Sequence, residues 1–361
     1  MKQKIITLYI LSTLTLFSCN NSLIQEKELA PKNIILMIGD GMGLGQITAA
    51  MYANNNTLSL EKIIHIGLLK THSASSIITD SAAGATAFST GEKTYNGSIN
   101  MSVDTLPLTP ITYEIQKMQK KTGIIATSSV THATPACFYG NQKNRYGVGE
   151  GLAQQFIQSD IDILMGGGED YFNNRSDNQN LLDSLEKKNY IIIDSITDNI
   201  PENTQRLINF CAPKEPNSKI NGRNDFLPIA TEKALEVLNN NNEKGFFLMI
   251  EGSQIDWGGH DNDSEYIISE TIDFDNTIEK VLQFAKQDQE TLVLITADHE
   301  TGGYGITGQN KKSGKLETGF LNDDHTATMV PIFAFGAGAE KFVGIYDNTE
   351  IYKKILTVFK K

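Results

Sequence analysis

The sequence predicts an α/β protein: a three-layer α/β/α sandwich on a mostly parallel central sheet, with a metal site at the carboxyl ends of the strands. Two observations carry this prediction. Short apolar runs rich in β-branched and aromatic residues alternate with segments of helical spacing, which is typical of a parallel sheet covered on both faces. Acidic and histidine residues gather where these runs end, and ligands bind at that edge of an open sheet.

The N-terminus has the form of an export signal. Lys2 and Lys4 precede an apolar stretch, 5–17, that is too short to span a membrane with proper flanks. Because Cys19 closes this stretch, residues 1–18 resemble a bacterial lipoprotein signal peptide with Cys19 as the lipidated residue. The alternative is an ordinary cleaved signal with a cysteine there by chance. We expect an exported protein, periplasmic or at the cell surface, that meets a membrane only through this anchor.

The rest of the chain is predicted to be a polar tether, 19–32, followed by a single domain, 33–361. Strands are expected at Asn33–Ile38, Thr122–Ala126, Asp162–Met165, Gly245–Ile250, Thr291–Thr296 and Val330–Phe335. Helices are expected at Ile111–Lys120, Gly151–Gln158, Asn180–Lys188, Thr231–Asn239, Tyr266–Lys286 and Asn348–Lys360. Two polar segments, 198–224 and 302–322, are predicted to be loops or small excursions.

Charge and cysteine content exclude some classes of protein. The net charge is −12, and removal of residues 1–18 makes it more negative because it takes away Lys2 and Lys4. Such a chain is a poor candidate for binding nucleic acid, so no nucleic-acid partner is expected. An anionic substrate would have to be attracted locally, by a metal or an arginine. Besides Cys19 only Cys137 and Cys211 remain, which allows one disulfide but no disulfide framework.

The stretch 78–91 is dominated by small residues and places Ser81 before a run of helix formers. A serine there can cap the helix, and taken alone this interpretation is favoured. It can also be a nucleophile, because a helix N-terminus favours a bound phosphate and small side chains let a ligand approach closely. The rest of the chain decides between the two.

Metal-ligating residue types recur at the strand ends. Four of the six histidines lie in these windows. Carboxylates that converge there would repel one another unless a divalent cation held them. Histidine with carboxylate suits zinc, and a set of oxygens suits magnesium, so the pattern predicts a metal hydrolase. The Asp, Glu and His residues in these windows include Asp40, His132, Glu251, Asp256, His260, Asp298, His299 and His325.

Four motifs together resemble the alkaline phosphatases, in the branch with three metals and a serine nucleophile. They are Asp-Gly-Met-Gly from Asp40, Thr-Asp-Ser-Ala-Ala-Gly-Ala-Thr-Ala from Thr79, Glu-Gly-x3-Asp-x3-His from Glu251 and Thr-Ala-Asp-His from Thr296. They occur in family order between about 33 and 336. The resemblance implies the α/β/α fold, a catalytic role for the domain 33–361, and hydrolysis of phosphate monoesters through a phosphoserine at Ser81.

The resemblance also implies the cofactors, two Zn²⁺ and one Mg²⁺. The implied ligands are Asp256, His260 and His325 for the first zinc, Asp40, Asp298 and His299 for the second, and Asp40, Thr134 and Glu251 for magnesium. The first zinc would lower the pKa of a bound water, and the second would contact Ser81. Activity should rise with pH.

The family uses an arginine to bind two phosphate oxygens, ten residues after a proline that corresponds to Pro135. That count gives Arg145, one of only four arginines in the chain, and a bidentate fork is a task that lysine performs poorly. The alternative is a surface arginine on a glycine-rich loop. Asp80 would orient Arg145 through an ion pair.

Two positions depart from many relatives. His132 stands where relatives have Asp or His, so the third site could take Zn²⁺, or His132 could act only through water. Trp257 stands where some relatives have a lysine that steadies phosphate through water, so phosphate affinity is expected to be lower; packing against a helix is its alternative role. The segment between His299 and His325 is short, which implies a reduced excursion at the usual dimer interface, although a homodimer stays open.

The expected function is therefore that of a metal-dependent phosphomonoesterase with phosphate monoesters as substrates. One alternative is a phosphodiesterase or a sulfatase on the same scaffold. A diesterase would gain little from Arg145, and the sulfatase motif Cys/Ser-x-Pro-x-Arg is absent after Ser81. The other alternative is a surface protein that binds phosphate or metal without turnover, which would have no use for Ser81.

Overall fold

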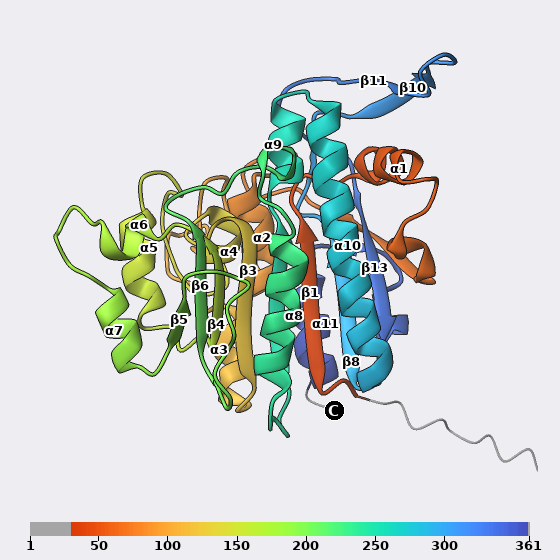
Figure 1. Cartoon of the computed structure of the whole chain (residues 1–361). Coiled ribbons are helices and arrows are strands. Elements are labelled where there is room, and N and C mark those ends of the chain that lie inside the picture. The colour runs from red at the N-terminus through yellow and green to blue at the C-terminus, as the bar shows by residue number, and fades with distance from the viewer. Residues whose placement is uncertain (1–29, 360–361) are drawn as a thin grey trace, which may run out of the picture.

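The computed structural model describes residues 30–359. A sheet of ten strands crosses it in the order β14-β2-β13-β8-β1-β7-β3-β4-β6-β5 (Figure 1). The strands are β1 (Asn33–Gly39), β2 (His65–Lys70), β3 (Lys121–Ser129), β4 (Ile163–Gly167), β5 (Ile191–Ile193), β6 (Leu207–Ala212), β7 (Phe246–Gly252), β8 (Thr291–Thr296), β13 (Val330–Gly336) and β14 (Gly344–Asp347). Neighbouring strands are parallel except where β13 pairs with β2 and β8.

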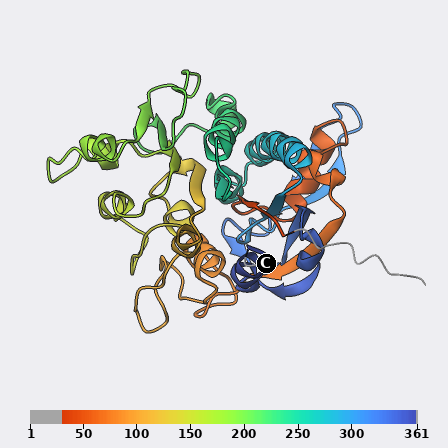
Figure 2. The ribbon, with the colours of Figure 1, turned by 90° about the horizontal axis from the view of Figure 1, so that it is seen from below.

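Helices cover both faces of this sheet, with α8 (Phe226–Asn239) and α10 (Ser264–Asp288) on one side. On the other side lie α2 (Ser81–Thr90), α3 (Ile111–Lys117) and α11 (Glu350–Phe359) (Figures 1 and 2). The remaining helices are α1 (Leu44–Ala53), α4 (Ala133–Ala136), α5 (Gly149–Phe156), α6 (Asp170–Asn173), α7 (Leu182–Lys187) and α9 (Gln254–His260), with 3₁₀ turns at Ser59–Lys62, Lys219–Asn221 and Ala339–Phe342. The predicted three-layer α/β/α fold is confirmed.

The central strands are buried on both faces, which explains their unbroken apolar sequence. Every residue of β1 and β8 is buried, and both faces of such strands must be apolar because helices pack on each. The long helix α10 turns Ile267, Phe274, Ile278 and Val281 into the same core, at the spacing of one helix face. One hydrophobic cluster runs through the described residues. The assignment of 33–361 to a single catalytic domain stays a prediction.

All six predicted strands and six predicted helices are present, with boundary shifts; α8 begins five residues earlier than expected, at Phe226. The interpretation of 198–224 as a loop or excursion is wrong in part, because β6 lies inside it and pairs with β4 in the main sheet. Its buried Asn209 hides the strand pattern, and the amide of this residue donates to Ile193 O at 2.8 Å. Three further strands of the sheet, β2, β5 and β14, were not predicted.

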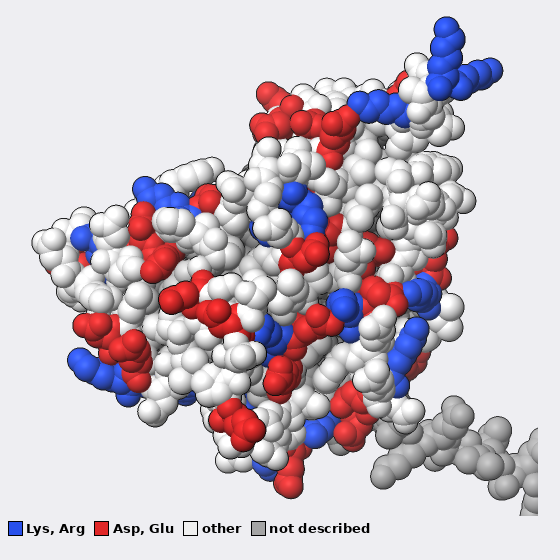
Figure 3. Space-filling view, viewed as in Figure 1, with Lys and Arg blue, Asp and Glu red and all other residues white. Residues whose placement is uncertain are grey.

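The segment 302–322 forms a projecting hairpin of β10 (Gly305–Gln309) and β11 (Leu316–Gly319), as expected of an excursion. Two short strands flank it, β9 (Glu300–Thr301) and β12 (His325–Thr326), and they pair with each other. Basic side chains gather at the tip of the hairpin, whereas acidic and basic side chains are interspersed over the rest of the face in Figure 3. The β9–β12 pair brings the two ends of the excursion together at the carboxyl edge of the sheet.

Cys137 and Cys211 are both free thiols, so the disulfide that the sequence allowed is not formed. Cys137 is buried beneath α2, whereas Cys211 is exposed on β6. The predicted signal peptide 1–18 and Cys19 lie outside the described residues. Within 30–359, no helix combines the length and the apolar character needed to cross a membrane.

Candidate active site

The N-terminus of α2 presents Ser81 to the carboxyl edge of the sheet. The helix is capped by Asp80, whose Oδ1 accepts from Ala83 N at 3.0 Å. The capping role that the local pattern suggested for Ser81 is therefore wrong, and its hydroxyl is free for another partner. Ser81 is 2% exposed, and its Oγ lies 3.3 Å from Nε2 of His299. A hydroxyl at a helix N-terminus is well placed for an anionic substrate.

Asp256 and His260 on α9 meet His325 on β12. His260 Nε2 lies 3.1 Å from His325 Nε2 and 3.4 Å from Asp256 Oδ2, and His325 Nε2 lies 3.5 Å from Asp256 Oδ1. Ligand atoms of three residues from two elements thus lie close together. The hydrogen bond between His260 and Asp256 raises the pKa of His260 to about 9, so this position favours positive charge.

Hydrogen bonds at the Nδ1 atoms of His260 and His325 fix the orientation of these two rings. His260 Nδ1 lies 2.7 Å from Asp323 O and His325 Nδ1 lies 2.8 Å from Thr79 O. A carbonyl oxygen can only accept, so Nδ1 donates in both rings. In the neutral imidazoles the Nε2 lone pairs then point at each other and at a carboxylate, an arrangement that a cation would stabilise.

A second group lies between the ends of β1 and β8. His299 Nε2 is 3.4 Å from Asp40 Oδ1 and 3.3 Å from Asp298 Oδ2, and all three side chains are fully buried. The two groups are adjacent, because the rings of His299 and His325 stack with centroids 3.6 Å apart. Asp40, Asp298 and His299 form one candidate metal set, and Asp256, His299 and His325 form another.

The test of whether these residues fit metal ions is the state of their buried oxygens. Both carboxylate oxygens of Asp40, Asp298 Oδ2, Glu251 Oε1 and Thr134 Oγ1 are buried without a hydrogen-bond partner. Buried polar atoms are normally paired, and each orphan costs on the order of 1–3 kcal/mol. So many orphaned oxygens around one edge of the sheet fit cation ligation, and the carboxylates of Asp40 and Glu251 repel each other there.

The electrostatics of these carboxyl groups support the same conclusion. Burial, with repulsion by Asp298, Asp256 and Glu251, raises the pKa of Asp40 well above its usual value. Burial likewise raises the pKa of Glu251 to about 8 and that of Asp298 to about 6. A bound divalent cation would balance the negative charge of all three carboxylates and so remove the unfavourable energy of ionising them in a buried site.

Arg145 reaches the site from the loop before α5. Its Nη1 lies 3.3 Å from Asp80 Oδ2, which also accepts from Gly97 N at 2.9 Å, and its Nη2 lies 3.3 Å from His132 Nε2. Asp80 thus joins the helix cap to the guanidinium group. The ring of Trp257 meets the ring of His132 edge-on, with the ring centroids 5.9 Å apart, so Trp257 packs against a site residue.

The backbone at the end of β1 turns sharply to admit these groups. Gly41 has φ +73°, and a Cβ there would lie 2.7 Å from both Asp256 Cα and Thr301 Oγ1. Its N–H donates to Asp298 Oδ1 at 3.3 Å. The position requires glycine for its conformation and for the close approach of Asp256.

Sequence reasoning missed supporting residues. Thr301 Oγ1 donates to Asp256 and lies 3.3 Å from His299 Nδ1, so it links the two groups. Asp324 lies among His260 and His325 as a candidate ligand and accepts from His325 N at 2.8 Å. A threonine two residues after His299 and an acid beside His325 were the available signals. Neither identifies a contact without the β9–β12 pairing.

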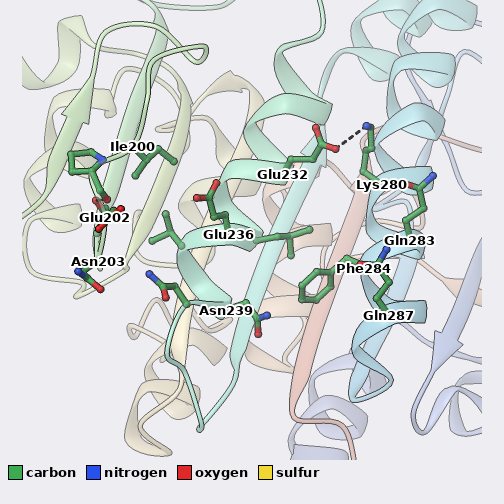
Figure 4. A pocket seen from close by; sticks show the side chains of 15 residues that line it. Ile200, Glu202, Asn203, Glu232, Glu236, Asn239, Lys280, Gln283, Phe284 and Gln287 are labelled. Atoms are coloured by element: carbon green, nitrogen blue, oxygen red, sulfur yellow. Dashed lines mark hydrogen bonds and ion pairs between the residues drawn. The ribbon is translucent and has the colours of Figure 1, made fainter.

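Ser81, Arg145 and the group of Asp256, His260 and His325 open into one cavity of about 680 Å³. Ser81, Asp80, Arg145, His132, Asp256, Trp257, His260 and His325 line it. A larger cavity of about 770 Å³ lies elsewhere, between α8, α10 and the loop 200–204 (Figure 4). Glutamates and amides surround it, and it contains none of the grouped ligands, so we place the reaction in the smaller cavity.

Comparisons with known proteins agree with this arrangement. A family model described as alkaline phosphatase matches residues 31–315. The chain is 29% identical to alkaline phosphatase 4 of Bacillus subtilis, with 100% of this chain and 97% of the relative covered. It is 30% identical to the alkaline phosphatase of Escherichia coli, with 89% and 84% covered.

Solved structures give the same result. The alkaline phosphatase of the Antarctic bacterium TAB5 is 42% identical, with a TM-score of 0.87 and 92% of this chain and 99% of that chain covered. A mutant of that enzyme, with one histidine replaced by glutamate, is described with Mg bound in its M3 site. The non-catalytic alternative finds no support in these relatives. The chain belongs to the alkaline phosphatase family and is a metal-binding phosphomonoesterase.

Proposed function

We propose that the protein hydrolyses phosphate monoesters through a phosphoserine at Ser81. Ser81 Oγ attacks phosphorus, so that a new P–O bond forms while the P–O bond to the alcohol breaks. Water then attacks the phosphoserine, which releases inorganic phosphate and restores the hydroxyl. The proton of Ser81 goes to the departing alcohol in the first step; in the second, the water oxygen bonds to phosphorus, one of its protons restores the Ser81 hydroxyl and the other stays with the phosphate. The observation that carries the proposal is the buried hydroxyl of Ser81 at the N-terminus of α2. It does not cap the helix, and it lies beside carboxylate oxygens that have no hydrogen-bond partner.

The residues that would hold the metals follow from the groups described above. Asp256, His260 and His325 would hold one Zn²⁺, and Asp40, Asp298 and His299 a second. Asp40, Thr134 and Glu251 would hold Mg²⁺, although the neighbouring His132, with a buried and unpartnered Nδ1, could let the third site take Zn²⁺. When bound, these ions supply charge stabilisation for the attacking and leaving oxygens and lower the pKa of water.

Arg145 would bind the two phosphoryl oxygens that are not in line with the attack. Its ion pair with Asp80 holds the guanidinium beside Ser81, and Asp80 together with Asp40 raises the pKa of Arg145 against the effect of burial. A monoester has three non-bridging oxygens, so two can bind Arg145 while the third faces the metal ligands, whereas a diester has one of the three esterified. The fork therefore favours monoesters.

We expect metal-replete protein to hydrolyse 4-nitrophenyl phosphate at least about tenfold faster than bis(4-nitrophenyl) phosphate, because one hydrogen bond to a charged group contributes about 1.5–3 kcal/mol. The sulfate analogue should react more slowly than the monoester. Initial rates from about pH 6 to about pH 10 measure this, and the monoester rate should rise with pH. Preference for the diester would contradict the proposal.

The arginine provides the matched control. Arg145→Ala should lower kcat/KM for the monoester more than for the diester and so narrow the ratio between them. Arg206→Ala removes an arginine that pairs with Asp160 and Asp162 outside the cavity, and it should leave the ratio unchanged. An unaltered ratio in Arg145→Ala would show that Arg145 does not contact the phosphoryl group.

We also propose that the catalytic domain 33–361 is exported and anchored through Cys19. Whether two copies form a homodimer stays an open part of this proposal. The lysines, the apolar stretch and the cysteine of the N-terminal sequence support this proposal. Expressed in a bacterium with a lipoprotein pathway, the full chain should fractionate with membranes, and Cys19→Ala should release activity into the soluble fraction. Equal membrane association of the two forms would contradict anchoring through Cys19.

A further inference from the structure

The catalytic cavity holds much more than a phosphoryl group. Its volume of about 680 Å³ lies in the range of roughly 300–1,000 Å³ typical of pockets for whole small molecules. A second cavity of about 450 Å³ adjoins it, and His132, Arg145 and Tyr146 line both. The space beyond the phosphate and metal positions is therefore available to the alcohol part of the substrate.

Tyr146 stands at the junction of the two cavities and has no structural task that explains it. Its side chain is 75% exposed, and its hydroxyl makes no hydrogen bond among the described residues. Its ring lies 5.9 Å from Cζ of Arg145. Gly147 follows it with open space where a Cβ would be, so the ring is accessible beside the phosphate-binding guanidinium.

Trp257 and Ile78 add apolar surface to the catalytic cavity. Trp257 is half-buried against His132. Ile78 is held in place because Asn96 Nδ2 donates to its carbonyl oxygen at 3.0 Å. With Tyr146, these side chains give the cavity two aromatic surfaces and one aliphatic surface.

The charges around the space disfavour an anionic leaving group. Arg145 is the only lysine or arginine in the lining of either cavity, and it already pairs with Asp80. Asp324 lines the catalytic cavity, and Glu150 and Glu215 line its neighbour. A further phosphate or carboxylate on the alcohol would face these carboxylates without a lysine or an unpaired arginine beside it.

We propose that Tyr146 and Trp257 form a leaving-group subsite, so that this enzyme favours phosphate monoesters of uncharged aromatic alcohols. The proposal rests on the proposed function, since it assumes that phosphate binds at Ser81 and Arg145. An aromatic leaving group would stack on the ring of Tyr146, and Trp257 on α9 would enclose it from the other side.

The test compares Tyr146→Ala, Tyr146→Phe and the control Tyr52→Ala in metal-loaded enzyme. Tyr52 is 52% exposed on α1 and lies outside both cavities. Substrates are phenyl phosphate and ethyl phosphate, and inhibitors are phenylphosphonate and methylphosphonate, which report binding without bond cleavage. Tyr146→Ala should raise KM for phenyl phosphate and Ki for phenylphosphonate by about two- to tenfold, the contribution of one aromatic pair.

For ethyl phosphate and methylphosphonate, Tyr146→Ala should change neither constant by more than about twofold, and kcat should hold for both substrates. Tyr146→Phe should restore KM for phenyl phosphate and Ki for phenylphosphonate, and Tyr52→Ala should match the unaltered enzyme in all four constants. Equal losses for aromatic and alkyl compounds, or no loss for either, would overturn the subsite while leaving the phosphatase mechanism intact. Failure of the unaltered enzyme to hydrolyse either ester would overturn the proposed function itself.

Discussion

Ser81→Ala should lower kcat/KM for a phosphate monoester by about 10³-fold or more, because it removes the group that forms the covalent intermediate. The hydroxyl is buried, and the cap of α2 comes from Asp80, so the helix should survive the substitution. Residual turnover would come from groups that still bind and polarise the ester. Steady-state rates measure the loss, and acid quenching with a labelled substrate should trap phosphoserine in the unaltered enzyme alone.

Ser98→Ala is the matched control for this experiment. Ser98 is also buried, and its Oγ has no hydrogen-bond partner, so its removal should change neither rate nor stability appreciably. Thermal unfolding of both variants would separate loss of chemistry from loss of fold. Unchanged turnover by a folded Ser81→Ala protein would contradict the covalent mechanism.

The catalytic edge was accessible from the sequence because parallel strands determine where side chains meet. Asp40, Glu251 and Asp298 each lie at or just beyond the end of a fully buried strand. Once a run such as β1 is identified as buried on both faces, the residue after it must lie at the shared edge. The prediction thus depends on hydrophobic pattern and chain order, which are local properties.

Local pattern failed where two adjacent residues compete for one task. Asp80 and Ser81 are both good helix caps, and the pattern favoured Ser81. Asp80 is the cap because its second carboxylate oxygen also accepts from Gly97 N and pairs with Arg145. Both partners come from loops that no periodicity describes, so only the folded chain shows which residue is left free.

The missed strands have a similar cause. β2 alternates between intermediate, exposed and buried residues near one edge of the sheet, and β14 forms that edge with two exposed residues. Edge strands are exposed on one side, so their sequences lack a continuous apolar run. The same limit applies to the carbonyl groups of Asp323 and Thr79, which orient His260 and His325: backbone partners leave no mark in the sequence.

Removal of divalent cations with a chelator should abolish turnover and lower the thermal midpoint by several degrees. Cations that bind only the native state stabilise it, by about 2.7 kcal/mol at a concentration one hundred times Kd. Without them the carboxylates of Asp40, Glu251 and Asp298 would face one another in a buried space. Zn²⁺ with Mg²⁺ should restore activity and midpoint together, whereas Mg²⁺ alone should not restore activity.

The pH dependence of the chelated protein gives a sharper test. Folding raises the pKa of Glu251 to about 8 and that of Asp298 to about 6, so between their unfolded values and these the native state binds more protons than the unfolded chain. Its stability should therefore fall as pH rises from about 4.5 to about 8. Bound cations compensate the same charges and should flatten this dependence. If thermal midpoints fell equally with and without metal, these carboxylates would not be the ligands, because ligation must remove the repulsion that makes their protonation favourable.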